Sequence, residues 1–159
     1  MSRRYAIPFQ NLGLSTNKQD MWAVKAGSSI PFILEEIRLD PCASSVSEFA
    51  LSLNLFQNGT GTYTAGTGGA GITASPRVAS DIAFHGTAVL QNTLQTVAGT
   101  GTKTVEDVGS WNLVNGWWWQ PLDPDHRVSV PVGATLVVSL DTAPASQTVS
   151  GNVIVREDY

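Results

Sequence analysis

The chain has 159 residues, enough for one domain with a packed core and too few for two ordinary domains. Charged residues make up only 14% of it, against roughly 25% in an average soluble domain. The net charge is −4 and the nine Lys and Arg residues are spread along the chain, which argues against nucleic-acid binding, since that needs basic side chains gathered on one face. Thr, Ser, Asn and Gly suit strands and turns, so we expect an all-β protein.

Alternating apolar and polar residues, bounded by Gly, Pro and Asn turns, predict about eight or nine short strands. In chain order the expected strands are 4–9, 20–26, 30–39, 48–56, 82–90, 105–113, 117–122, 134–141 and 148–156. The clearest is 48–56, where Phe49, Leu51, Leu53 and Leu55 fall on one face. The last two strands have the pattern of the strongest hairpin in the chain.

The strand at 30–39 has a competing interpretation as a helix, because Glu35 and Glu36 are good helix formers. Pro31 and the β-branched residues favour the strand. On a regular strand two adjacent side chains point to opposite faces, so we do not expect the two glutamates to form a catalytic pair.

The strand count predicts a two-sheet antiparallel β-sandwich of jelly-roll type with long Gly/Thr-rich loops. An immunoglobulin-like sandwich and a closed barrel are the alternatives. We expect a single domain over residues 1–159, in which 1–20 is a candidate for an extended N-terminal arm and 59–76 is a long loop. Six glycines lie between residues 59 and 71, so we expect little of this loop to be buried and the fold to tolerate its replacement.

Nothing in the sequence assembles a recognisable catalytic or cofactor site. The single cysteine, Cys42, has no histidine in a motif around it and is best explained as a structural thiol. No serine lies in a GxSxG context. The stretch GTGGAG at residues 66–71 lacks the lysine of a phosphate-binding loop. We therefore expect a protein without enzymatic activity and without a cofactor.

Asp123, Asp125 and His126 form the only compact cluster of metal-ligand residue types. Asp-Pro-Asp is also an ordinary turn sequence, because aspartate caps turns and proline fixes φ. The turn is the favoured interpretation, so we expect no metal site.

Three consecutive tryptophans, Trp117, Trp118 and Trp119, are the most unusual feature of the sequence. Successive residues of a strand alternate between faces, so the three cannot all enter one core. The simplest interpretation is that Trp117 and Trp119 pack inside while Trp118 lies under a loop. A subunit contact and a platform for stacking sugars are the two functional alternatives.

The N-terminal stretch MSRRYAIPFQNLGLST lacks the apolar run of a Sec signal peptide. No stretch approaches 18 apolar residues, so no membrane-spanning segment is expected. We expect synthesis in a reducing cytoplasm.

The layout of the whole chain resembles that of small structural proteins of tailed bacteriophages. The resemblance lies in the opening RRYAIPFQNLGLST and KQDMWAVKAG, the strand pair PFILEEIRLDP and SEFALSLNLFQNG, and the loop TGTYTAGTGGAGITASP. It continues in GSWNLVNGWWWQPLDPDHRVSVPVGATLVVSLDTAP and the closing SGNVIVRED. Such proteins are head decoration, cement or head-fibre proteins, without catalytic motifs.

The resemblance implies a protein on the capsid surface of the virion, made in the host cytoplasm, whose partner is the major capsid protein. It also implies a homo-oligomer, with a trimer favoured because a trimer matches three-fold lattice positions. Arg3 and Arg4, in a basic N-terminal segment of an acidic protein, are candidate contacts to the capsid together with Trp117, Trp118 and Trp119.

Two other classes of function stay open at this point. One is a carbohydrate-binding or receptor-binding β-sandwich on a virion, with a glycan as partner, suggested by the tryptophans. The other is an enzyme that uses Asp123, Asp125 and His126. Binding assays on capsids and on glycans would separate decoration from carbohydrate binding.

Overall fold

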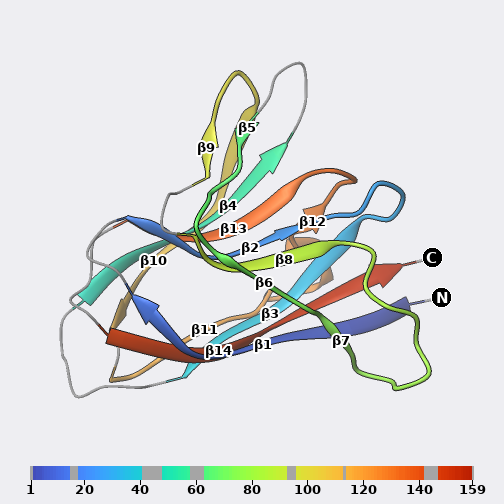
Figure 1. Cartoon of the computed structure of the whole chain (residues 1–159), viewed down its shortest axis with the longest axis horizontal. Coiled ribbons are helices and arrows are strands. Elements are labelled where there is room, and N and C mark those ends of the chain that lie inside the picture. Colours follow the sequence, from blue (N-terminus) through green and yellow to red (C-terminus); the bar gives the residue numbers. More distant parts are fainter. Residues whose placement is uncertain are drawn as a thin grey trace.

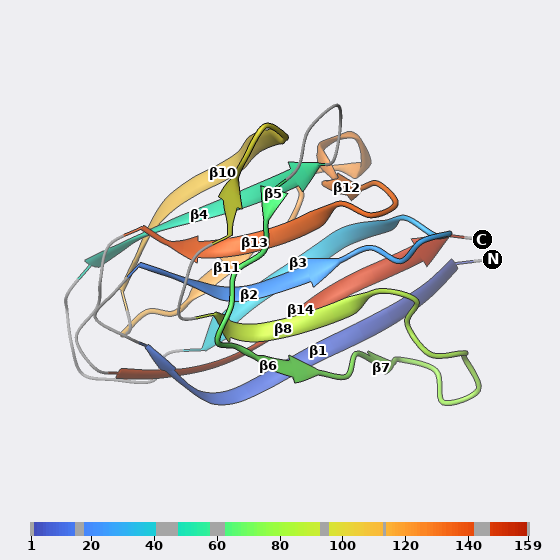
Figure 2. The same ribbon diagram turned by 45° about the horizontal axis from the view of Figure 1, so that its top comes forward.

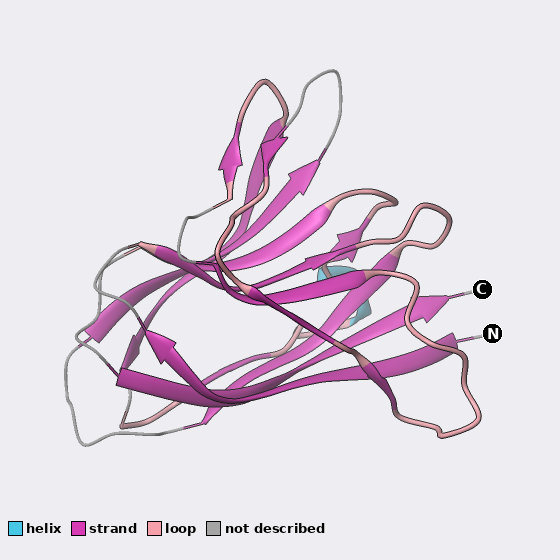
Figure 3. Ribbon diagram, viewed as in Figure 1, coloured by secondary structure: helices cyan, strands magenta, loops and turns pink. Residues whose placement is uncertain are grey.

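The computed structural model describes residues 2–14, 18–40, 48–57, 63–92, 96–112, 114–141 and 147–158. Cys42 lies outside these ranges. Within them the protein is all-β, as expected, with one short 3-10 helix (Figure 3). None of the helical structure in these ranges has the length and apolar character needed to cross a bilayer.

The elements follow one another closely along the chain. They are β1 Ser2–Leu14, β2 Gln19–Lys25, β3 Phe32–Asp40, β4 Glu48–Gln57, β5 Tyr63–Thr64, β6 Ala70–Ile72, β7 Ser75–Pro76, β8 Thr87–Asn92, β9 Val97–Ala98, β10 Thr102–Asn112, β11 Trp117–Trp119, the 3-10 helix η1 Pro124–His126, β12 Ser129–Val130, β13 Thr135–Leu140 and β14 Gln147–Asp158.

Two antiparallel sheets form the layers of the molecule (Figures 1 and 2). Sheet A has the order β11-β3-β14-β1-β7, with β12 also paired to β3. Sheet B has the order β10-β4-β13-β2-β8-β6. A small third sheet, sheet C, consists of β5 and β9. Their inner faces enclose the main core.

Strands from the first half of the chain pair with strands from the second half in reverse order. β1 pairs with β14, β2 with β13, β3 with β11 and β4 with β10. In addition β14 pairs with β3, and β13 pairs with β4. The two termini therefore lie side by side, where Ser2 is opposite Asp158 (Figure 1).

The expected C-terminal hairpin is wrong. Both strands exist, but β13 belongs to sheet B and β14 to sheet A. Alternation of apolar and polar residues identifies a strand with one buried face and contains no information on which strand lies beside it. The partner of each strand is instead set by long-range pairing across the sandwich.

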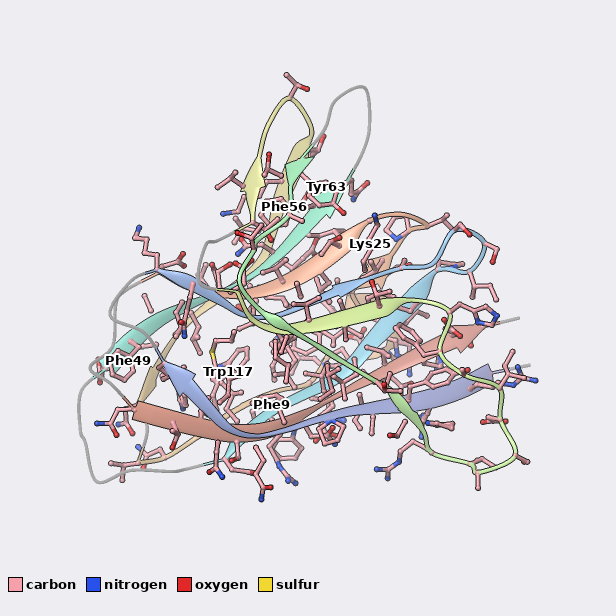
Figure 4. The ribbon with its side chains drawn as sticks, in the orientation of Figure 1. Phe9, Lys25, Phe49, Phe56, Tyr63 and Trp117 are labelled. Carbon is pink, nitrogen blue, oxygen red and sulfur yellow. The ribbon has the colours of Figure 1, made fainter. Side chains whose placement is uncertain are left out.

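The main core is made of apolar side chains from the inner faces of both sheets. Leu51, Leu53 and Leu55 of β4 are buried there, as the period-two pattern predicts. Phe49, at the end of that face, packs edge-on against Trp111 with ring centroids 6.3 Å apart. Figure 4 shows Phe9 and Trp117 near the same interior.

The N-terminal residues are part of sheet A and do not form an extended arm. Ser2–Leu14 runs along β14, with a bulge between Phe9 and Leu12. The pairing requires a glycine at position 151, opposite Phe9. A Cβ at Gly151 would overlap the carbonyl oxygen of Arg38 and would lie 2.8 Å from the ring of Phe9.

The Gly/Thr-rich segment contributes short edge strands, since β6 ends sheet B and β7 ends sheet A. As expected, little of it is buried: among residues 63–76 Ala74 is the one buried residue. Tyr63 covers a second, smaller core formed by Ala23, Phe56 and Val137 (Figure 4). Its ring lies 5.9 Å from that of Phe56, and its hydroxyl hydrogen-bonds to Thr135. The side chain that sequence reasoning missed is therefore the one aromatic residue among the glycines.

A buried polar network adjoins this second core. Asp20 is 0% exposed, and its carboxylate accepts hydrogen bonds from the backbone N–H and the hydroxyl of Thr96, each at 2.7 Å. Ser139 donates to its other oxygen at 3.1 Å. The segment that contains Thr96 is thereby held against sheet B by the carboxylate of β2.

Candidate functional site

The three tryptophans of β11 divide between the core and the surface. Trp117 and Trp119 pack against the main core, as expected. Trp118 is 67% exposed, so it does not lie under a loop. Its register partner is Arg38 on β3, which places the indole on the outer face of sheet A.

The two N-terminal arginines are engaged in ion pairs. Arg3 lies 3.5 Å from the carboxylate of Asp81, and Arg4 lies 2.7 Å from that of Glu35. The positive charge predicted for this segment is therefore partly neutralised by the protein itself, and Arg4 contributes to a site on the outer face of sheet A.

That site is a groove of about 500 Å³ over the outer face of β1, β14 and β3. The segment between β11 and β12 forms one wall, and the turn after β7 contributes to the lining. We call it the sheet A groove. Its lining residues are Arg4, Glu35, Glu36, Arg38, Arg77, Gln120, Pro121, Asp123, Pro124, Arg127, Asn152 and Ile154.

A bulge in β3 brings both adjacent glutamates into this groove. Ile154 of β14 is opposite Glu36, while the next residue, Val155, is opposite Leu34, so Glu35 is an extra residue on β3. The expectation that the two glutamates point to opposite faces is therefore wrong, because the bulge interrupts the alternation.

Ion pairs organise part of the groove. Glu35 lies between two guanidinium groups, since Arg156 is 3.2 Å away in addition to Arg4. Arg38 pairs with Asp40 at 2.9 Å. Two further arginines of the lining, Arg77 and Arg127, have no ion-pair partner among the residues that the structure describes. The groove thus presents two guanidinium groups able to bind an anion.

The wall between β11 and β12 contains the predicted Asp-Pro-Asp turn. Asp123 caps η1, and its carboxylate accepts hydrogen bonds from the N–H groups of Asp125 and His126 at 2.8 and 3.1 Å. His126 Nδ1 lies 2.8 Å from the same carboxylate, and this hydrogen bond lowers the pKa of the Asp123 carboxyl. The turn interpretation is confirmed; in the ranges described, no three His, Cys, Asp or Glu side chains are grouped to hold a metal ion.

Exposed apolar side chains recur on the edge strands β10 and β11 and in the connections that follow them. By register Val105 and Val108 lie on the outer face of sheet B, opposite Asn54 and Ser52, whereas Trp118 lies on the outer face of sheet A. Five of the nine exposed large hydrophobic residues found in the described ranges fall between residues 105 and 122. We call this surface the β10–β11 edge; its members are Val105, Val108, Val114, Trp118 and Leu122. Val108 is 68% and Leu122 is 93% exposed.

Comparison of the chain with family models, curated proteins and solved structures finds no match. The groove was also not foreseen from the sequence. Its lining comes from β1, β3, β14 and two connections, and no local motif marks residues such as Arg77, Gln120 and Asn152. Of the candidate residues named from the sequence, Arg4 and Asp123 line the groove, and Trp118 lies on the same face of sheet A.

Proposed function

We propose that the protein is a non-catalytic virion structural protein that binds the outer surface of an assembled phage capsid and stabilises or decorates it. Its partner is the major capsid protein, and it assembles as a homo-oligomer, with a trimer favoured. It is made in the host cytoplasm and resides on the capsid surface. The resemblance of the whole chain to phage structural proteins supports this function.

The nested strand pairing supports a jelly-roll fold within this proposal. In a jelly roll one long antiparallel hairpin is wrapped into two sheets, so the first strand pairs with the last and the second with the last but one. The four pairs β1–β14, β2–β13, β3–β11 and β4–β10 follow this rule. Jelly rolls occur in viral capsid proteins and in lectins, so the fold suits a virion role without establishing it.

The β10–β11 edge is the observation that carries the proposal. Isolated apolar residues on a surface are ordinary, whereas several on two adjoining edge strands, with a tryptophan among them, suit a protein–protein contact that wraps this edge. Trp118, at 67% exposure, offers the largest side chain of that surface for burial against a partner. A protein that binds only the assembled lattice stabilises it by mass action, with no chemical step.

Binding to capsids that lack the protein tests this proposal. Changing Val105 and Val108 together to Ser, or Trp118 to Ala, should weaken binding about tenfold or more, because truncating a central interface side chain typically costs over 1 kcal/mol. Val132→Ser is the matched control, since Val132 is 47% exposed and lies outside this edge. Capsids with the wild-type protein should withstand a higher temperature before they release DNA.

Two results would contradict the proposal. If the wild-type protein does not bind bare capsids, the proposed capsid-binding function is wrong. If the variants of the β10–β11 edge bind capsids as tightly as the Val132→Ser control, this edge does not contact the capsid. Sedimentation velocity of the free protein tests the oligomer separately, and a monomer at all accessible concentrations would contradict the trimer.

Carbohydrate binding is the second candidate function. It is favoured by one observation, namely that exposed Trp118 lies on the same sheet face as the sheet A groove, as the register partner of the groove residue Arg38. An aromatic ring beside planar polar side chains is an arrangement suited to a sugar.

A further inference from the structure

The polarity of the sheet A groove restricts the class of ligand. Its volume of about 500 Å³ lies within the range of roughly 300–1,000 Å³ typical of small-molecule sites. Nine of its twelve lining residues are polar or charged, the others being Pro121, Pro124 and Ile154. An apolar ligand would remove these groups from water without replacing their hydrogen bonds, which is unfavourable. A hydrated polar ligand fits this lining better.

The free arginines favour a carboxylate on that ligand. Arg77 and Arg127 line the groove without an ion-pair partner in the described part of the chain, whereas Arg4 and Arg38 are paired with Glu35 and Asp40. A guanidinium group is a planar donor whose geometry matches a carboxylate.

The acidic residues of the lining limit how much negative charge the ligand can carry. Glu35, Glu36 and Asp123 stand beside the four arginines of the groove. A phosphate dianion concentrates its charge on one group, so it meets more repulsion from the three lining carboxylates than do single carboxylates spaced along a ligand. A ligand with isolated carboxylates among neutral hydroxyl groups avoids most of this repulsion.

Hydroxyl groups are what the remaining polar side chains can bind. The side chain of Glu36 has no hydrogen-bond or ion-pair partner in the described ranges, and its carboxylate can accept hydrogen bonds from hydroxyl donors. Gln120 and Asn152 also line the groove, and their amide groups can both donate and accept hydrogen bonds. The exposed indole of Trp118, on the same face, is placed to stack on the C–H face of a sugar ring that extends beyond the groove.

We propose that the sheet A groove binds an acidic oligosaccharide, with sugar carboxylates held by Arg77 and by Arg127 and the sugar hydroxyls held by Glu36, Gln120 and Asn152. The inference rests on the second candidate function and is independent of capsid binding. It also differs from an apolar peptide-docking surface, because nine of the twelve lining residues are polar or charged.

Calorimetric titration with trigalacturonic acid tests the proposal, with its methyl ester as the uncharged counterpart. The acid should bind at least tenfold more tightly than the ester. Arg77→Ala and Arg127→Ala should each weaken binding of the acid about tenfold or more, as expected when a charge-assisted contact is removed. Lys25→Ala is the charge-matched control, since Lys25 is exposed at the end of β2 in sheet B (Figure 4). Unchanged thermal unfolding of the variants would show that they fold.

Several outcomes would overturn the inference. Equal binding of acid and ester would show that the carboxylate is not recognised. Unaltered binding by both arginine variants would show that the ligand does not bind at Arg77 and Arg127. Equal competition by inorganic phosphate would indicate an anion site alone, and equal competition by an oligoglutamate would indicate a peptide partner. Capsid binding is measured on the same variants; Arg77→Ala and Arg127→Ala should retain it, so failure of one proposal is distinguishable from failure of the other.

Discussion

The buried carboxylate of Asp20 should be one of the most sensitive positions in the protein. It is 0% exposed and accepts three hydrogen bonds, two from Thr96 and one from Ser139. In Asp20→Ala the three donors lose their acceptor, and each buried donor left unpaired costs about 1–3 kcal/mol. Allowing for local relaxation, we expect the free energy of unfolding to fall by about 3–5 kcal/mol.

The variant Asp20→Asn separates the effect of the carboxylate's charge from the effect of the side chain's shape. Asp20→Asn keeps one oxygen for Ser139, but its amide nitrogen cannot accept the hydrogen bonds that Thr96 donates. We therefore expect Asp20→Asn to lose less stability than Asp20→Ala, about 1–3 kcal/mol.

Urea unfolding followed by tryptophan fluorescence measures both losses, and calorimetry should show a fall in Tm of roughly 2–4 °C for each kcal/mol. Asp40→Ala is the matched control. Asp40 forms an exposed pair with Arg38, and such pairs contribute only about 0–1 kcal/mol. Hydrogen exchange at the amide of Thr96 should accelerate in the Asp20 variants alone. The reasoning is refuted if Asp20→Ala is no less stable than the Asp40 control.

Two further predictions concern the Gly/Thr-rich segment and the close approach of strands in sheet A. Replacing residues 63–72 by a Gly-Ser linker removes Tyr63 from the second core and the pairing of β6 with β8, so Tm should fall by at least roughly 6 °C. A change below about 2 °C would show that the loop is dispensable after all. Gly151→Ala should lose about 1–3 kcal/mol because its Cβ would overlap the β3 backbone, whereas Gly71→Ala, with nothing within 4 Å of the new Cβ, should be neutral. Equal stability of the two glycine variants in urea would contradict the close-approach argument.

The sequence located most of the long strands. The strand expected at 82–90 overlaps β8 only from residue 87 onward, that expected at 117–122 ends at residue 119, and the short strands β5, β6, β7, β9 and β12 were not expected. In the strand expected at 48–56, strict alternation of apolar and polar residues corresponds to β4, which spans Glu48–Gln57. The same logic correctly assigned Trp117 and Trp119 to the core side of β11. Both results depend only on the local geometry of a strand, in which successive side chains point to opposite faces.

Features that depend on a break in this alternation, or on contacts between distant segments, could not be predicted from the sequence. The bulge at Glu35 requires a two-against-one match between β3 and β14, which is decided by strands more than a hundred residues apart in sequence. Asp20 was equally hidden, because a carboxylate on a strand is normally assigned to solvent. Its burial depends on Thr96, a residue of a distant segment that no pattern connects to it. The groove could not be predicted from the sequence for the same reason, because five separate parts of the chain line it.

The two outer faces of the sandwich differ in a way that bears on where a partner can bind. The chain covers much of sheet B's outer face itself, where Tyr63 lies on Phe56 and Val137 and the Thr96 segment is held by Asp20. Side chains that could contact a ligand are therefore already used there for folding. The outer face of sheet A keeps its groove and Trp118 accessible, together with Arg77 and Arg127, which have no ion-pair partner in the part of the chain that the structure describes. A substitution of Tyr63, Phe56 or Asp20 should act on function only through stability, whereas Arg77 and Arg127 can be changed with little effect on folding. Comparing ligand binding with unfolding for both sets of variants would test this division, because loss of binding at unchanged stability is expected only on the sheet A side and at the β10–β11 edge.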